Sequence, residues 1–331
     1  MPLSTPEITV LIPTRDRWEL LSLTLAGALA QRDVELEVLV VDDGSTDGTT
    51  ERLAQLGDPR VRHIRNDSSI GVTRARNRGI AEAHGQWIAL LDDDDLWSPR
   101  KLREQLDIAV DTGATFVYSA AAQLERGEVR EINAPPPAAG AQAELLSRCV
   151  IPSGCSNVIV SAEAIRAVSG FDERLRMMAD WDLWIRLAST GQAADCQETH
   201  VAYVIHDSNM HSDQALGHID ELRYIDEKFR AERADSGVEI DGASFTRWIG
   251  GAAWRAGDRR TAWRIYMHGA RKYRKLGNVA RAGAAVLHLD GLRPERRSES
   301  ASGPDLEWLP LYRPGGAIAE AGASIARIRD R

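Results

Sequence analysis

The run Asp92-Asp93-Asp94-Asp95 is the strongest chemical signal in the sequence, because it follows directly after the apolar segment Trp87–Leu91. Four adjacent carboxylates repel one another unless a cation lies among them. Oxygen ligands favour Mg²⁺ or Mn²⁺, and Mg²⁺ commonly binds substrate phosphates as well, so a diphosphate is the expected partner. A solvated acidic turn before a helix is the alternative. A Ca²⁺ loop of the EF-hand type fits poorly, because Trp97 stands where that loop needs glycine.

Polar residues also follow two earlier apolar segments. Thr14-Arg15-Asp16 come after Ile8–Pro13, and the segment Glu37–Asp43 ends in two carboxylates followed by Gly44-Ser45. In an open parallel α/β sheet, ligands bind beyond the carboxyl ends of the strands. Three polar strand ends on one rim therefore predict a binding site there.

The elements that must position these residues alternate between strands and helices over the first 120 residues, which predicts parallel βαβ units in an α/β sheet. The expected strands are 8–13, 37–43, 61–65, 87–91 and 114–120, and the expected helices are 18–30, 49–56, 72–84 and 100–111. Asp47 suits the cap of the second helix, Ser98-Pro99 suit the start of the fourth, and Gly85 suits the end of the third.

The second half is organised differently. Strands are expected at 157–160 and 201–206, with a helix at 180–189 between them, and only helices after about residue 213. Those helices are predicted at 213–233, 244–256, 260–276 and 278–289. The last thirty residues carry Gly, Pro and Ser clusters and are expected to be loosely attached.

Composition excludes several classes of protein. The chain has 331 residues, 43% of them hydrophobic, which allows a sizeable core. Its formal net charge of −8 argues against a nucleic-acid partner. Three cysteines without a C-x-x-C pair are expected to be reduced, and neither a secretory signal nor a membrane-spanning segment is apparent, so we expect a cytoplasmic protein. Peripheral contact with the inner membrane face stays open.

Several segments together resemble glycosyltransferase family 2, whose members have the GT-A fold. The matching blocks occur in the family's order and cover roughly residues 8–212: ITVLIPTRDR (8–17), EVLVVDDGSTDGT (37–49), GVTRARNRGIAEAHGQWIALLDDDDLWSPRKL (71–102), SGFDERL (169–175), DWDLWIRLA (180–188) and YVIHDSNMHS (203–212). The resemblance implies an α/β GT-A (Rossmann-like) fold, with a mostly parallel sheet flanked by helices and a C-terminal helical region. The implied domains are a catalytic domain over 1–225 and a helical region over 226–331.

The resemblance implies a role for each matching position in nucleotide-sugar binding. Those positions are Pro13, Thr14, Arg15, Asp42, Asp43, Arg74, Arg76, Asp92 and Asp93. One carboxylate of Asp42 and Asp43 is expected to read an imide N–H of the nucleobase, and an Asx-type turn at Asp43 is the alternative. Arg74 and Arg76 are expected beside the donor, with a solvent-facing helix turn as the alternative. Asn77 either caps or contacts the acidic strand end.

The expected metal ligands are Asp94, Asp92 and His206, and the expected cofactor is Mg²⁺ or Mn²⁺. Asp94 falls where the family binds the ion, whereas Asp92 or Asp93 meets the ribose or the water shell of the metal. His206 stands in a Y-x-x-H segment that approaches the metal or diphosphate in the family, and His211 is a weaker candidate. Asp95 is expected to begin the turn into the next helix, and Trp97 to pack in the core.

Asp180 aligns with the family's catalytic base. In the family this acid follows a glutamate, whereas Ala179 precedes it here. Asp182 is the second candidate for the base. It lies near the apolar face of its predicted helix, however, so an ion pair or a structural hydrogen bond is the role expected of it. An ordinary helix N-cap is the alternative role of Asp180.

The resulting prediction is an inverting glycosyltransferase that uses an NDP-sugar, with a UDP- or dTDP-sugar as the favoured donor. It is expected to move the sugar to a hydroxyl group of a glycan, a lipid-linked acceptor or a small molecule. A non-catalytic nucleotide-binding scaffold of the same fold is the alternative, favoured by Ala179. A sugar nucleotidyltransferase ranks lower, because it needs a Gly-rich loop after the first strand and no glycine occurs before Gly27.

A basic, Trp-bearing region follows in an otherwise acidic chain. Its basic residues are Arg247, Arg255, Arg259, Arg260, Arg264, Arg271, Lys272, Arg274 and Lys275. Such a surface fits an anionic acceptor or a membrane, and a solvated helical face that caps the catalytic domain is the favoured alternative.

Overall fold

The computed structural model describes residues 6–206, 217–255, 257–274, 276–287, 306–313 and 316–327. Two compact units can be distinguished by the contacts within them. The first comprises 1–142, 150–205 and 299–331, and the second comprises 143–149 and 206–298. The predicted domain boundary at residue 225 stays a prediction.

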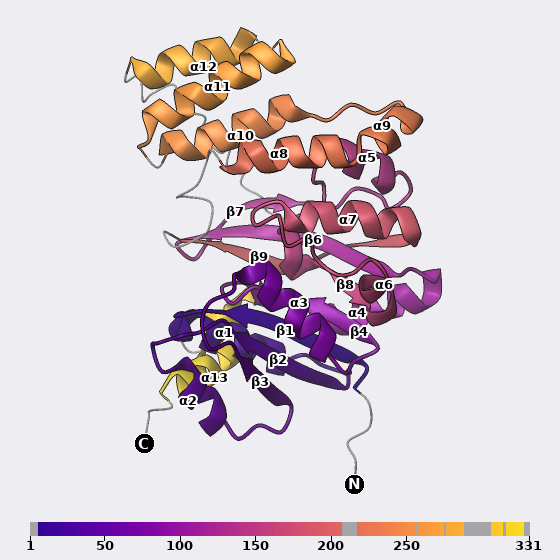
Figure 1. The fold of residues 1–331 in the computed structure, drawn as a ribbon. Helices are drawn as coiled ribbons and strands as arrows, with labels where there is room; N and C mark the ends of the chain where they lie inside the picture. The colour runs from indigo at the N-terminus through magenta and orange to yellow at the C-terminus, as the bar shows by residue number, and fades with distance from the viewer. Residues whose placement is uncertain are drawn as a thin grey trace. The chain divides into compact units, whose positions relative to one another are not determined.

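The first unit is built on a sheet whose strands appear in Figure 1. They are β1 Ile8–Thr14, β2 Leu36–Asp42, β3 Val61–Arg65, β4 Trp87–Leu90, β5 Leu96–Trp97, β6 Phe116–Glu125, β7 Glu128–Asn133, β8 Ile159–Ser161 and β9 Ala193–Ile205. Their order is β3-β2-β1-β4-β8-β6-β9-β5, with β7 paired to β6. The pairs among β3, β2, β1 and β4 are parallel, as is β6 with β9, whereas β5, β7 and β8 pair antiparallel. The sheet is therefore mixed, and the predicted GT-A-type α/β fold is confirmed.

Helices flank this sheet in the first unit. They are α1 Trp18–Leu29, α2 Thr49–Gln55, α3 Val72–Glu82, α4 Lys101–Thr112, α6 Ala162–Ala167, α7 Ala179–Thr190 and α13 Ala317–Ala326, and short 3₁₀ turns η1 and η3 occupy Gly154–Asn157 and Leu309–Tyr312. The core between strands and helices is apolar. Alternate residues of β1 and β2, such as the fully buried Ile12 and Val40, pack against apolar residues of α1, such as Leu21.

Two expectations about helix ends are refined. Asp47 accepts hydrogen bonds from Thr49 N at 3.1 Å and from Trp18 N at 3.1 Å, so one carboxylate satisfies the starts of both α2 and α1. Gly85 is not the cap of α3, because that helix ends at Glu82 and its C-cap is Ala83, in an extended conformation. The reason for glycine at 85 is close packing, since a Cβ there would lie 2.4 Å from the backbone nitrogen of Thr9.

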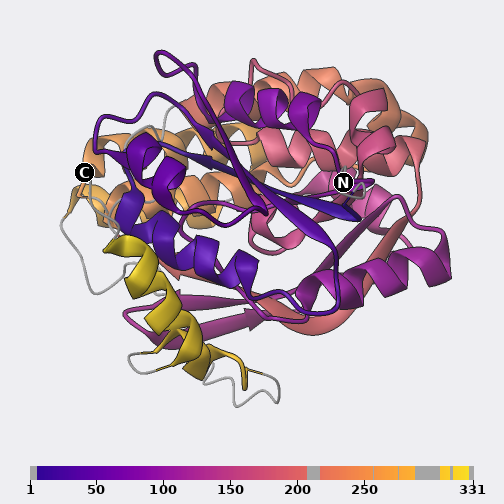
Figure 2. The same ribbon diagram turned by 90° about the horizontal axis from the view of Figure 1, so that it is seen from below.

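The expectation of a loosely attached C-terminal segment is wrong for its described residues. Figure 2 shows α13 beside α1, and the two helices are in contact. The apolar positions Ile318 and Ile325 join the main core, and the hydroxyl of Tyr312 donates to Trp97 O at 2.7 Å. Helical spacing of these apolar residues outweighs the Gly and Pro clusters around them.

The second unit is helical. It contains most of α5 Ala141–Ser147, together with α8 Gly217–Lys228, α9 Arg230–Ser236, α10 Gly242–Arg255, α11 Arg259–Tyr273 and α12 Leu276–Val286. Helices occur in all four predicted ranges, 213–233, 244–256, 260–276 and 278–289, but the first range holds two helices, α8 and α9. The helix in the third range ends at Tyr273 rather than at 276, because Arg274 adopts a left-handed conformation with φ +52°. Residues 213–216, 256, 275 and 288–289 lie outside the described residues. None of the described helices combines the length and the apolar character that a membrane span requires.

Candidate active site

The parallel pairing of β1 with β4 brings the acidic run to the end of β1. Leu11 lies opposite Leu90, where β4 ends, and β1 ends shortly afterwards at Thr14. Thr14 Oγ1 then donates to Asp93 Oδ2 at 2.6 Å, and both side chains are buried. Burial and repulsion from Asp94 raise the pKa of Asp93 to about 7, although Arg17 and Thr14 act in the opposite direction. The predicted convergence of these two strand ends is thus present.

Two arginines partly compensate the four carboxylates. Arg17 Nη1 lies 2.9 Å from Asp94 Oδ2 and 3.2 Å from Asp93 Oδ1. Arg76 is buried, stacks its guanidinium over the ring of Phe171 at 5.4 Å and pairs with Asp92. Arg76 therefore reaches the acidic run as a neighbour of Asp92, whereas Arg17 was not among the predicted site residues.

Asp95 does not begin the turn into the next helix, as the sequence had suggested. It is buried, accepts from Ser156 Oγ at 2.5 Å and from Val204 N at 3.1 Å, and leads into β5. Burial, followed by the charges of Asp94 and Asp92, raises its pKa well above the usual value. A buried carboxylate needs such donors, and here they tie the acidic run to η1 and β9. Trp97 is buried, as expected for a packing residue.

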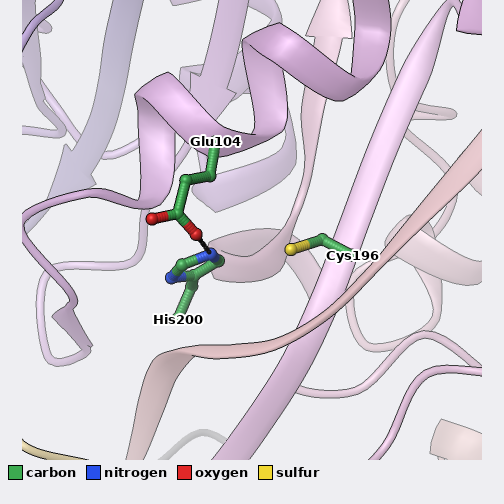
Figure 3. A group of neighbouring side chains, drawn as sticks. All are labelled: Glu104, Cys196 and His200. Carbon is green, nitrogen blue, oxygen red and sulfur yellow. Dashed lines mark ion pairs between the residues drawn. The ribbon is translucent and has the colours of Figure 1, made fainter. Parts of the chain in front are cut away.

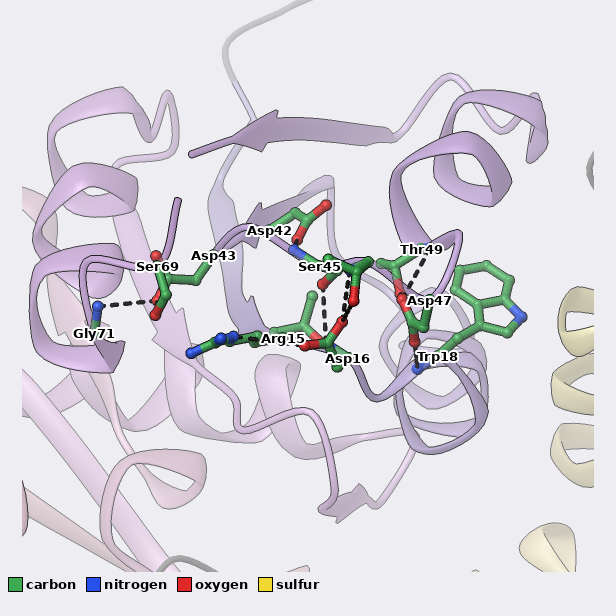
Figure 4. Close-up of polar contacts among 12 residues, drawn as sticks. Arg15, Asp16, Trp18, Asp42, Asp43, Ser45, Asp47, Thr49, Ser69 and Gly71 are labelled. Atoms are coloured by element: carbon green, nitrogen blue, oxygen red, sulfur yellow. Dashed lines mark hydrogen bonds and ion pairs between the residues drawn. The ribbon is translucent and has the colours of Figure 1, made fainter. Parts of the chain in front are cut away.

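The end of β2 is shown in Figure 4. Asp42 is fully buried, accepts from Ser45 N at 2.8 Å and pairs with Arg65 at 3.0 Å. The turn into residues 44–45 is therefore closed by Asp42 rather than by Asp43. Arg15 is exposed and lies 3.5 Å from the carboxylate of Asp16.

Asp43 orders the loop that leads into α3. Its carboxylate accepts from Asn66 Nδ2, Ser69 Oγ and the backbone N–H groups of Ile70 and Gly71, at 2.7 to 2.9 Å. Burial alone would raise the pKa of Asp43, but these four hydrogen bonds together lower it. The carboxylate is thus committed to the chain at the start of α3. Its contact with a nucleobase, like that of Pro13, Thr14, Arg15 or Asp42, stays a prediction.

On α3, Arg74 and Asn77 face another partner. The exposed Arg74 pairs with Glu173 at 3.1 Å. Asn77 donates to Phe171 O at 2.9 Å and accepts from Phe171 N at 2.8 Å, so it neither caps the helix nor contacts the acidic strand end. An amide side chain satisfies both backbone groups of one residue, which explains why it fixes the 170–173 turn.

Asp180 lies in the first turn of α7, whose N-cap is Met178, so an N-cap role does not account for it. Burial raises the pKa of Asp180 to about 6, while the N–H of Trp181 at 2.7 Å and the charge of Arg76 lower it. Gly154 of η1 has φ +52°, and a Cβ at that position would lie 2.7 Å from Asp180 Oδ2. Glycine therefore lets η1 approach the carboxylate.

Asp182 has a different environment. It is fully buried and pairs with Arg186 one helical turn later, at 2.7 Å, while Arg186 Nη1 also donates to Val168 O at 2.6 Å. This is the structural ion pair that the helical spacing suggested. Asp182 thus holds α7 against the end of α6.

His206 directly follows β9, is partly buried and falls in the second unit. Its role as a metal ligand stays a prediction. His211 and the rest of the final matching block, residues 207–212, lie outside the described residues. Sequence reasoning missed Arg17, Gly154 and Ser156; only the position of Arg17 beside the first polar strand end gave any signal.

Comparison with known proteins places these features in one family. Residues 9–136 match the model of glycosyl transferase family 2. The succinoglycan biosynthesis protein ExoO of Rhizobium meliloti (strain 1021) is 31% identical over 251 residues, which cover 70% of each chain. The chain belongs to glycosyltransferase family 2. It is an inverting glycosyltransferase, as the resemblance implied.

Two further similarities extend this result. An Escherichia coli protein named UDP-Glc:alpha-D-GlcNAc-diphosphoundecaprenol beta-1,3-glucosyltransferase WfgD is 30% identical over 111 residues, 34% of this glycosyltransferase and 44% of WfgD. The mannosyltransferase PcManGT of Pyrobaculum calidifontis, solved with GDP-Man and Mn²⁺, has a TM-score of 0.52 at 17% identity, covering 98% of this chain and 87% of that one. The latter likeness concerns the fold.

Proposed function

We propose that this glycosyltransferase uses Mg²⁺ or Mn²⁺ and a nucleoside-diphosphate sugar, and that Asp180 accepts the proton of the acceptor hydroxyl. The observation behind this proposal is that the buried Arg76 pairs with Asp92, while its positive charge also lowers the pKa of Asp180. Asp92, assigned to the donor, and Asp180, assigned to the acceptor, are therefore proposed to lie at one site around Arg76. A single displacement at the anomeric carbon requires such an arrangement.

The donor set of the acidic run fits a hard divalent cation. Its ligands are oxygen only, and two arginines neutralise only part of the charge of Asp92, Asp93 and Asp94, as the raised pKa of Asp93 indicates. Asp94 and Asp92 would hold the ion, with His206 as the further predicted ligand. When bound, the ion neutralises charge on the departing nucleoside diphosphate.

Asp180 is suited to general-base chemistry. A pKa of about 6 leaves the carboxylate ionised at pH 7 but more basic than an ordinary aspartate. Asp180 takes the proton of the acceptor hydroxyl while that oxygen forms a bond to the anomeric carbon. The bond from that carbon to the diphosphate breaks with its electron pair, and the centre inverts.

A UDP-sugar is the donor we propose to test first. The name of the relative WfgD specifies UDP-Glc, whereas the fold neighbour PcManGT was solved with GDP-Man. At the predicted base site, Asn66, Ser69 and Arg65 surround the two carboxylates of β2. These donors hold the carboxylates in place at the strand end where the nucleobase is predicted to bind.

The proposal is tested by calorimetry with UDP and Mn²⁺ on the wild-type chain and on Asp94→Ala. We expect metal-dependent binding to be lost while the fold is kept, because removing one acid from a repelling cluster does not destabilise it. Exposed Asp107→Ala is the matched control. Unchanged metal-dependent affinity in Asp94→Ala would remove the assignment. Slow hydrolysis of one of several NDP-sugars in the presence of Mn²⁺ would identify the donor.

We further propose a lipid-linked acceptor at an anionic membrane surface. From residue 242 to 287 the chain has ten Arg and Lys residues and one acid, Asp258, although its total charge is −8. On α11, Arg260, Arg264 and Arg271 are exposed on the same face as Trp263, which is 42% exposed. Arginines around an exposed tryptophan suit the headgroup region of an anionic bilayer. WfgD, by its name, acts on a diphosphoundecaprenol-linked sugar.

Flotation with phosphatidylglycerol vesicles tests this surface at low and high salt. We expect the wild-type chain to float at low salt and the double variant Arg264→Glu with Arg271→Glu to stay at the bottom. The matched control, Arg32→Glu with Arg126→Glu, changes two exposed arginines of the first unit and should float. Absence of flotation in the wild type would remove the membrane proposal and leave the solvated helical face.

A further inference from the structure

A second group of ligand-type side chains lies away from the acidic run, between α4 and β9. Glu104, Cys196 and His200 each offer one atom, and the three atoms lie within 4.8 Å of one another (Figure 3). Glu104 Oε2 is 3.0 Å from His200 Nε2, and the thiol of Cys196 points toward the same place. Cys196 and His200 are 4% exposed, whereas the side chain of Glu104 is 29% exposed.

The path of β9 brings the two buried members together. Cys196 lies opposite Ser119, and Val201 lies opposite Ala121. Between these two paired positions β9 advances by five residues, whereas β6 advances by two. The extra residues form bulges, which redirect side chains at functional positions in many sheets. The exposed Gln197 and Glu198 occupy the excursion, and His200 returns beside Cys196. Regular pairing of β9 with β6 would not require these extra residues.

His200 is a buried imidazole that lacks the hydrogen bonds such a side chain usually makes. Neither ring nitrogen makes a hydrogen bond of good geometry within the protein, although Nε2 is close to Glu104. A buried polar group without such bonds costs free energy, and structures usually avoid it. A cation bound at Nε2 would give that nitrogen a partner.

We propose that Glu104, Cys196 and His200 bind one Zn²⁺-class cation, with solvent on the Glu104 side supplying a fourth ligand. Thiolate, imidazole and carboxylate together select Zn²⁺ or Co²⁺ over Mg²⁺. Tetrahedral coordination needs ligand atoms about 3.5 Å apart. Side-chain rotations that move the ligand atoms by about 1 Å would therefore complete the site. Such an ion would join α4 to β9, and Val204 of β9 donates to Asp95 of the acidic run. This inference is independent of the proposed donor chemistry.

The other charged groups near the site lie at the start of α4. His200 is buried, and its charged partner at the site is Glu104, 3.0 Å from Nε2. Lys101 is fully buried over the ring of Trp97 and donates to Gln105 at 2.7 Å, and burial holds its pKa well below the usual range. Arg100 occupies the other carboxylate oxygen of Glu104 at 2.7 Å and faces solvent.

Titration of the metal-free full chain with Co²⁺, in excess Mg²⁺ to occupy oxygen-only sites, tests the proposal. We expect one equivalent with the charge-transfer absorption of a thiolate ligand in the wild type and in the control Cys149→Ser. Cys196→Ser should lose the thiolate band, and His200→Ala should weaken binding by at least about tenfold. Absence of the band in the wild type, or its persistence in Cys196→Ser, would overturn the proposal.

A measurement on the wild type alone covers variants that fail to fold. Zn²⁺ should slow alkylation of Cys196, mapped by mass spectrometry, and leave alkylation of the more exposed Cys149 unchanged. It should also raise the melting temperature, since a ligand of the folded state stabilises that state. Equal alkylation of Cys196 with and without Zn²⁺ would overturn the site.

Discussion

Arg17 Nη1 lies 2.9 Å from Asp94 Oδ2, so the carboxylate assigned to the metal is paired with a guanidinium of the loop after β1. The pair is largely shielded from solvent, since the side chains are 24% and 9% exposed. A cation that binds Asp94 must therefore compete with Arg17. This relationship connects the first polar strand end to the acidic run, and it would set the apparent affinity for the proposed metal ion.

Removing Arg17 should strengthen metal binding in the absence of nucleotide. Arg17→Gln deletes the competing positive charge, and we expect Mn²⁺ affinity to rise by about tenfold at pH 8, equivalent to ~1.4 kcal/mol. Paramagnetic relaxation or calorimetry measures it. Arg60→Gln, which changes an arginine paired with Asp58, is the control. Equal or weaker affinity in Arg17→Gln would show that Asp94 does not bind the ion.

Asp93 should make the stability of the protein depend on pH. Its folded pKa of about 7 exceeds the usual 3.8, so unfolding releases a proton between these values and the free energy of unfolding falls as pH rises. Asp93→Asn removes this loss. We expect the variant to be about 2–4 kcal/mol more stable than the wild type at pH 8, with the difference vanishing near pH 4.

Urea unfolding at pH 4 and pH 8 measures this difference, with exposed Asp107→Asn as the control. An advantage of the same size at both pH values would mean that the Asp93 charge is not its cause. Added Mn²⁺ should stabilise the wild type more than Asp93→Asn at pH 8, because it offsets the same repulsion.

Gly154 should matter through Asp180 rather than through the fold. In Gly154→Ala the new Cβ would meet Asp180 Oδ2 at 2.7 Å, and the flexible carboxylate can yield by rotating away. We expect kcat to fall by about 10- to 100-fold, because a displaced base no longer meets its proton. Gly113→Ala carries similar strain at φ +71° with no atom within 4 Å.

Turnover and melting temperature of these two glycine variants should be compared. Both should lose about 1 kcal/mol of stability from the positive φ. Only Gly154→Ala should lose turnover. Equal turnover in the two variants would mean that the position of Asp180 beside η1 has no catalytic consequence.

The convergence of strand ends could be predicted from sequence because it depends on local patterns. Apolar segments ending in polar residues, separated by helices, place Thr14 and Asp93 on one rim whatever the details of packing. The same reasoning identified the helices of the second unit from their periodicity. Asp182 could be assigned to an ion pair because helical spacing placed it near the apolar arc.

The remaining contacts depend on partners distant in sequence. Ser156 and Gly154 lie in a short 3₁₀ turn without periodicity, so nothing local indicates that they meet Asp95 and Asp180. Bulges in β9 likewise bring His200 to Cys196 in a way that alternation does not predict. Asp43 showed why a motif role and a structural role are hard to separate, because its carboxylate is fixed by four donors of the following loop.

Turnover of Asp180→Asn, measured beside Asp182→Asn with the true acceptor, tests the central claim most directly. Asp180→Asn should keep donor affinity and lower kcat by about 10³-fold or more, because the amide cannot accept the proton. Asp182→Asn should mainly lower the melting temperature, since it breaks the buried pair with Arg186. In the wild type, kcat/KM should fall as pH drops through about 6. Near-normal transfer by Asp180→Asn would contradict the account and place the base elsewhere.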